Sequence, residues 1–177
     1  MERLIINFDD LKKNTNNLDP SKGKLLLFMH TPNLDFVVRA ASLFMPVSGM
    51  ARPQSNKIVD NLFKASRKKF TERIFDPKEI LELLNYLKIG KTCLYAPDQD
   101  YGYKNSIFVN FFGHKALTVK FPYIAKRRAK CDVYIFSLEK KGFKYEANLE
   151  KILLDGTDME KDLRKKNYKI EEIISKR

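Results

Sequence analysis

Tryptophan is absent from this sequence, and cysteine and histidine are scarce, with two of each. Cys93 and Cys131 each lie in an apolar, strand-like run and lack any CxxC spacing. The sequence therefore predicts neither a zinc site nor a disulfide framework. We expect both thiols to be reduced core residues of a protein in a cytoplasmic setting.

Long apolar runs are also lacking. No stretch approaches the ~20 residues that a helix needs to cross a bilayer. The first residues do not show the charged-then-apolar order of a signal peptide. We therefore expect the chain, as written, to be soluble or peripheral to a membrane.

What the chain does have is positive charge, with 34 lysines and arginines against 22 acidic residues and a formal net charge of +12. This balance favours polyanionic partners: nucleic acid, anionic lipid or an acidic protein. The 177 residues are 44% apolar and 32% charged, which is typical of one folded domain with a single core. We expect residues 1–177 to form that single domain.

Helical and extended patterns alternate along the chain. This alternation, followed by a hairpin, predicts an α/β fold with a mixed, mostly parallel central sheet flanked by helices, a late β-hairpin and a C-terminal helix. The predicted elements are a strand at 24–29, helices at 32–44, 55–70 and 76–89, strands at 92–96 and 106–113, a helix at 122–129, strands at 131–139 and 143–150, and a last helix at 159–174.

The first candidate functional residues follow the first predicted strand. His30 lies where this strand gives way to a helix, and strand ends of open α/β sheets are where ligands bind. Asp35, five residues later, is expected in the first turn of that helix, where the chain's bend can bring the two side chains together. An aspartate can hold the proton of one imidazole nitrogen and leave the other free to act as a base. The plain alternative is a strand-end histidine beside a helix-start charge.

Two carboxylates, Asp98 and Asp100, follow the next buried strand in the segment YAPDQDYG. One interpretation is that Asp98 fixes a basic partner such as Arg67 while Tyr101 and Gly102 form a turn that shapes the pocket. The competing interpretation is a divalent-cation site, because many nucleotide-sugar glycosyltransferases use Asp-x-Asp in this way. Such enzymes usually need a larger nucleotide-binding domain than this chain can house.

Four segments, read in order, resemble the blocks of a known family. They are HTPNLD, ARPQSNKIVDNLFKASR, YAPDQDYG and IFVNFFG, the last followed by ALT. Together they resemble the late acyltransferases of lipid A assembly (lauroyl/myristoyl transferase type), within the H-x4-D/E glycerolipid acyltransferase superfamily. The resemblance covers about residues 25–136, and PDQDYG with FVNFFG is its most specific part. It implies a glycerolipid-acyltransferase-like fold.

The resemblance also implies roles for the matching residues. In the family, the histidine is the general base that deprotonates a sugar-linked hydroxyl, and the acidic residue five positions later orients it. Those roles fall to His30 and Asp35, here with aspartate where the lipid A branch more often has glutamate. An arginine of the second block and the first aspartate of the third also function in the family. The positions implied for substrate binding are Arg67, Asp98, Asn33, Arg52, Asp100 and Tyr101.

The implied reaction is acyl transfer from an acyl carrier protein thioester to a hydroxyl of a lipid A precursor, at the cytoplasmic face of the bacterial inner membrane. We expect no cofactor, no metal and no nucleic-acid partner. The basic clusters at 66–69 and 126–130 and the lysines of the last helix are expected to meet the carrier protein, the acceptor phosphates or anionic headgroups. Four aromatic residues either line an acyl groove or, as we favour, belong to the core: Phe108, Phe111, Phe112 and Phe121.

The sequence departs from the family pattern in two respects. Family members normally carry an N-terminal membrane helix and a tryptophan-containing segment near the C-terminus, and neither is found in this chain. This departure supports a second hypothesis, in which the chain is a catalytically impaired short form that acts as a basic membrane- or polyanion-binding module.

Overall fold

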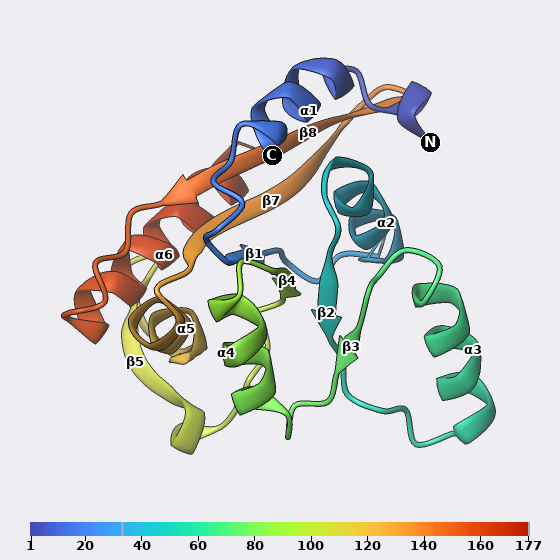
Figure 1. The fold of residues 1–177 in the computed structure, drawn as a ribbon. Helices are drawn as coiled ribbons and strands as arrows, with labels where there is room; N and C mark the ends of the chain where they lie inside the picture. Colours follow the sequence, from blue (N-terminus) through green and yellow to red (C-terminus); the bar gives the residue numbers. More distant parts are fainter. Residues whose placement is uncertain (33, 177) are drawn as a thin grey trace.

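A six-stranded sheet forms the centre of the molecule in the computed structural model, which describes residues 1–32 and 34–176 (Figure 1). The strand order is β3-β2-β4-β1-β7-β8, and only β8 runs antiparallel to its neighbour. The predicted mixed, mostly parallel sheet is therefore confirmed. The strands are β1 (Lys24–Leu27), β2 (Ser48–Met50), β3 (Ile74–Phe75), β4 (Thr92–Tyr95), β7 (Asp132–Lys141) and β8 (Lys144–Ile152).

Helices cover both faces of this sheet. On one face lie α1 (Phe8–Asn16) and α2 (Leu34–Phe44), and on the other α4 (Ile80–Lys88), α5 (Phe121–Ala129) and α6 (Met159–Ser175). The sequence KLLL of β1 is apolar throughout its last three residues because it faces a core on both sides. Leu25 and Leu27 pack with α4, α5 and α6, while Leu26 packs with α1 and α2.

Helix α3 (Lys57–Arg67) lies apart, at the margin of the molecule beyond β3 (Figure 1). None of its residues is buried. Asn56 caps it by accepting hydrogen bonds from the backbone N–H groups of Ile58 and Val59. The helix is therefore held locally by its cap, and its apolar side is left facing solvent.

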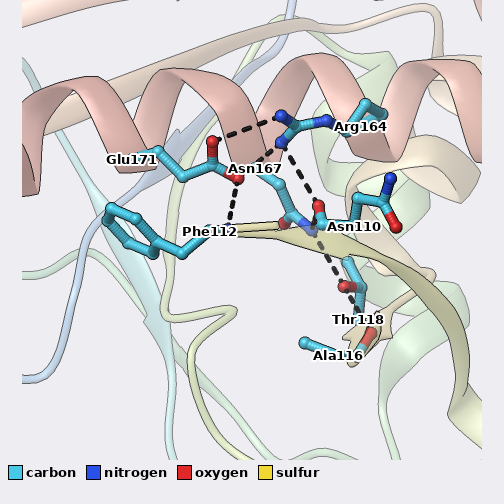
Figure 2. Close-up of polar contacts among 7 residues, drawn as sticks. All are labelled: Asn110, Phe112, Ala116, Thr118, Arg164, Asn167 and Glu171. Carbon is cyan, nitrogen blue, oxygen red and sulfur yellow. Dashed lines mark hydrogen bonds and ion pairs between the residues drawn. The ribbon is translucent and has the colours of Figure 1, made fainter. Parts of the chain in front are cut away.

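A separate hairpin of β5 (Ser106–Phe111) and β6 (His114–Val119) packs against α6. Figure 2 shows the polar network that joins them. Asn167 of α6 donates to the carbonyl oxygen of Asn110 (3.0 Å) and to Thr118 Oγ1 (3.1 Å). Glu171 accepts from the backbone N–H of Phe112 (3.0 Å) and pairs with Arg164. These contacts fix the rotation of α6 about its own axis, so they decide which of its side chains face inward.

Both cysteines are confirmed as core residues, and neither is in a disulfide. Burial raises the pKa of the Cys131 thiol to about 12, and burial likewise raises the pKa of Cys93. Neither thiol is thus suited to nucleophilic chemistry near neutral pH.

Several elements differ from the sequence prediction. The predicted helix at 76–89 begins later, at Ile80, because Asp76 and Glu79 close a turn of their own before it. The polar lead-in contains α1, and strands β2, β3 and β6 were not predicted. The two short 3₁₀ turns, η1 (Glu2–Leu4) and η2 (Tyr103–Asn105), were not predicted either.

Candidate functional site

The site is built at the carboxyl ends of two neighbouring parallel strands. β1 and β4 pair in register through Leu27 and Tyr95, so the segments that follow them leave the sheet side by side. His30 follows β1 and Asp98 follows β4. This is the edge at which open α/β sheets place their ligands, as the sequence analysis expected.

Asp98 holds His30 through both of its carboxylate oxygens. Oδ1 lies 2.7 Å from the imidazole Nδ1, and Oδ2 accepts the backbone N–H of His30 at 2.6 Å. The amide nitrogen of Gln99 lies 3.3 Å from Nε2. A carboxylate oxygen can only accept, so the contact with Asp98 requires the proton on Nδ1, and the neutral imidazole then keeps its lone pair on Nε2. The imidazole is thus oriented with Nε2 available as a base.

This histidine is accessible from outside. The side chains of His30 and Asp98 are 39% and 28% exposed to solvent. A hydroxyl that displaced the Gln99 amide could therefore approach Nε2 directly.

The pairing of the two aspartates differs from the one expected. Asp35, in the first turn of α2, does not hold the imidazole; its Oδ1 accepts a hydrogen bond from Arg67 Nε at 3.2 Å. Arg67 ends α3 and also stacks over Phe63, with its guanidinium carbon 5.3 Å from the ring centre. Because Asp98 enters from the neighbouring strand directly beside His30, it takes the position that spacing alone suggested for Asp35. Arg67 accordingly pairs with Asp35, and not with Asp98.

The other candidate residues lie around the turn after β4. The Oδ1 of Asp100 accepts the backbone N–H of Gly102 (2.7 Å), and Gly102 adopts φ +72°, a conformation that favours glycine. Tyr101 donates to the carbonyl oxygen of Ala96 (2.8 Å), and Arg52 lies over its ring at 5.6 Å. The expected Tyr-Gly turn is therefore present. Asn33 lies outside the described residues.

A cavity of about 560 Å³ opens beside the histidine. It is lined by His30, Asp98 and Gln99 and by residues of the β5–β6 hairpin and α6. From α6 it receives Lys166 and Asn167. The sequence alone does not single out Lys166. It lies in a basic run just before YKIEEIISKR, where its pattern is the same as that of the more exposed lysines beside it.

Only two of the four phenylalanines take an expected role. Phe121 is 5% exposed and belongs to the core, as favoured. Phe111 lines the cavity beside His30. Phe108 and Phe112 are 52% and 45% exposed, so they are neither buried in the core nor enclosed in a groove.

Within residues 1–32 and 34–176, no group of three or more His, Cys, Asp or Glu side chains is arranged to hold a metal ion. In the same residues, every helix is too short or too polar to cross a membrane.

The fold and site define an α/β protein with an accessible histidine–carboxylate pair at the carboxyl edge of its parallel strands. Comparison with known proteins gives the family. The chain belongs to the bacterial lipid A biosynthesis acyltransferases, whose family pattern matches residues 3–177. The resemblance on which the sequence analysis relied is thereby confirmed.

Individual relatives match part of the chain. It is 34% identical over 90 residues to a lipid A biosynthesis acyltransferase of Haemophilus influenzae, which covers 51% of this chain and 29% of the relative. It is 33% identical over 91 residues to the lipid A biosynthesis lauroyltransferase of Escherichia coli, covering 51% and 30%. A second Haemophilus influenzae acyltransferase is 28% identical over 134 residues, covering 74% and 42%. The matched part of the chain thus spans less than half the length of each of these relatives.

Proposed function

We propose that this chain transfers a fatty acyl group from a thioester to a hydroxyl of a lipid A precursor. The observation that carries the proposal is the hydrogen bonding of His30, which places the proton on Nδ1 against Asp98 and leaves Nε2 facing an open cavity. A histidine so held is suited to take a proton from an alcohol. Membership of the lipid A acyltransferase family supplies the acceptor class.

The reaction needs no enzyme nucleophile. His30 Nε2 takes the hydroxyl proton while the oxygen attacks the thioester carbonyl carbon, and the carbonyl electron pair moves onto its oxygen. Collapse of this tetrahedral oxyanion expels the thiolate, which takes the proton back from the imidazolium. Asp98 stabilises the imidazolium between these two steps through its bond to Nδ1.

The thioester donor in this proposal is an acyl carrier protein. Such proteins are acidic, and the chain's net charge of +12 favours their approach. In α5 the basic cluster occupies the last turn, with Lys126, Arg127 and Arg128. Arg67 pairs with Asp35 in the first turn of α2, the helix that follows His30, and its guanidinium fork suits a phosphate oxygen of the acceptor.

Helix α3 supports docking at an anionic membrane surface. Its exposed apolar residues are Ile58 (73%), Val59 (38%), Leu62 (67%) and Phe63 (38%). Lys57, Lys64 and Arg67 lie on the same helix. An apolar stripe flanked by lysines and arginines is the pattern of helices that lie in a bilayer interface. The Arg67–Asp35 pair joins this helix to α2, so docking through α3 would bring lipid-borne acceptor to the site.

The double substitution Ile58→Ser with Leu62→Ser is expected to weaken binding to vesicles that contain phosphatidylglycerol by at least about tenfold. Fully burying one such side chain contributes about 1.5–3 kcal/mol, and ~1.4 kcal/mol is a factor of ten. Vesicle sedimentation at several salt concentrations measures this. Ile89→Ser, which removes a side chain of equal exposure (72%) from another part of the molecule, is the matched control. If the double variant binds vesicles as tightly as wild type, α3 does not contact the membrane.

The proposed function is tested by mass spectrometry of lipid A. Cells that lack one late acyltransferase are complemented with this chain, and we expect the lipid A to gain the mass of one acyl group. The control is the chain with His30→Ala, which should leave the mass unchanged while accumulating to the same level. If the intact chain folds and leaves the lipid unchanged, the acyltransferase proposal fails. Retention of that chain on anionic vesicles would then favour the basic binding module.

A further inference from the structure

Lys166 is the most deeply buried charged group that faces the candidate site. The residue is only 3% exposed, yet it lines the cavity that contains His30 and Asp98. Among the described residues, no ion pair or hydrogen bond of the Lys166 side chain is found. Neighbouring lysines differ: Lys165 pairs with Asp155 and Asp162, and Lys169 pairs with Glu150 and Glu172.

The polar network of Figure 2 explains why Lys166 faces inward. Asn167 is bonded to the β5–β6 hairpin, and Arg164 with Glu171 fasten α6 to the same hairpin one turn on either side. With α6 fixed at these three residues, the side chain between them has no freedom to rotate to the surface. The position of the Lys166 side chain is therefore set by the contacts between α6 and the hairpin.

Burial of an ammonium group is costly, because the charged form loses hydration. Burial lowers the pKa of Lys166 to about 8, and the negative charge of Asp98 opposes this lowering. The titratable groups facing Lys166 across the cavity are His30, Asp98 and Asp100, all from the segments after β1 and β4. The hairpin contributes only uncharged side chains to the lining.

We propose that Lys166 is a catalytic residue whose ammonium group stabilises the oxyanion formed on the thioester carbonyl. The inference rests on the proposed function, whose tetrahedral intermediate carries one negative oxygen. His30 takes up the proton at one side of the cavity, and the lysine supplies positive charge at the other. A cation already fixed by the fold stabilises developing charge without having to reorganise.

The first test measures turnover of the full chain with Lys166→Met, which replaces the side chain by an unbranched one that is one atom shorter and carries no charge. We expect kcat to fall by about 10²–10³, as for loss of one oxyanion donor, with KM changed less than about threefold. In the wild type, kcat should decline as pH rises through about 8, where the ammonium loses its proton. This decline should be absent from the variant. Lys13→Met, which replaces an exposed lysine of α1, should behave as wild type.

Folding of the variant is checked by thermal unfolding. The pKa of Lys166 is lower in the folded state than its ordinary value of 10.5, so the charged lysine destabilises the fold below about pH 8, and this cost disappears as pH rises to above 10. At pH 7 Lys166→Met should therefore unfold at a higher temperature than wild type. A variant with wild-type kcat, or one that raises KM alone, overturns the proposed role.

A second measurement does not depend on turnover. The monomethyl ester of octylphosphonic acid carries one negative oxygen on a tetrahedral centre and so mimics the intermediate. Calorimetry should show at least about tenfold weaker binding to Lys166→Met than to wild type and Lys13→Met, consistent with loss of one charged contact. Equal binding, or none to wild type, overturns the inference.

The two proposals fail separately. If lipid A is acylated and Lys166→Met matches wild type in every assay, the role of Lys166 fails and the acyltransferase proposal stands. If lipid A is unchanged while the phosphonate binds in a Lys166-dependent manner, the acyltransferase proposal fails and an anion site at Lys166 remains.

Discussion

Replacing His30 by alanine is expected to lower the turnover number by ~10²–10⁴, the usual contribution of a positioned general base. The reason is that, among the described residues, Nε2 of this imidazole is the accessible basic nitrogen that Asp98 orients. The measurement is initial-rate kinetics with an acylated carrier protein and a lipid A precursor. Because the substitution removes no core packing, the thermal unfolding temperature should change little.

The chain offers a matched control in its second histidine. His114 lies exposed at the start of β6, so His114→Ala should leave turnover unchanged. A His30→Ala variant that retains full turnover would show that another group removes the proton. The acyltransferase chemistry would then have to be reassigned to a different residue.

Replacing Asp98 by asparagine is expected to be nearly as damaging, at ~10²–10³ in turnover number. Asparagine has one oxygen and one NH₂ group where aspartate has two oxygens. If its oxygen keeps the bond to the His30 backbone N–H, its NH₂ must donate to Nδ1. The imidazole proton then moves to Nε2, which removes the lone pair that acts as the base.

Comparison with Asp35→Asn decides between the two aspartates. The sequence pattern and the family resemblance assign the orienting role to Asp35, whereas the structure pairs His30 with Asp98. If Asp98→Asn is nearly silent and Asp35→Asn is severe, the pairing seen here is not the one used in turnover. Asp158→Asn is the control, because asparagine caps a helix as well as aspartate does.

The general position of the site could be predicted because it depends on local signals. A short apolar run followed by Thr31 and Pro32 predicts a strand that ends before a helix, and the segment TCLYA followed by Pro97 predicts another. Where two such strands are parallel neighbours, the polar residues after them meet at one edge. This reasoning brought His30 and Asp98 into one site before their contact was known.

The details that could not be predicted depend on distant parts of the chain. The register of β1 against β4 brings Asp98 beside His30. The placement of α3 brings Arg67 to Asp35, so Asp35 forms an ion pair with Arg67 and not with His30. β2 contains Gly49 and has no apolar periodicity, so it forms a strand only because β3 and β4 flank it. Lys166 faces the cavity because of contacts between α6 and a hairpin more than forty residues earlier.

The inert core cysteines make site-specific labelling straightforward. With both native thiols buried and their pKa values raised, thiol reagents should not modify the folded chain at neutral pH. A single cysteine introduced at an exposed position of α3, such as Ile58, would therefore be the only reactive thiol. An environment-sensitive fluorophore there could report directly whether this helix leaves water when vesicles are added.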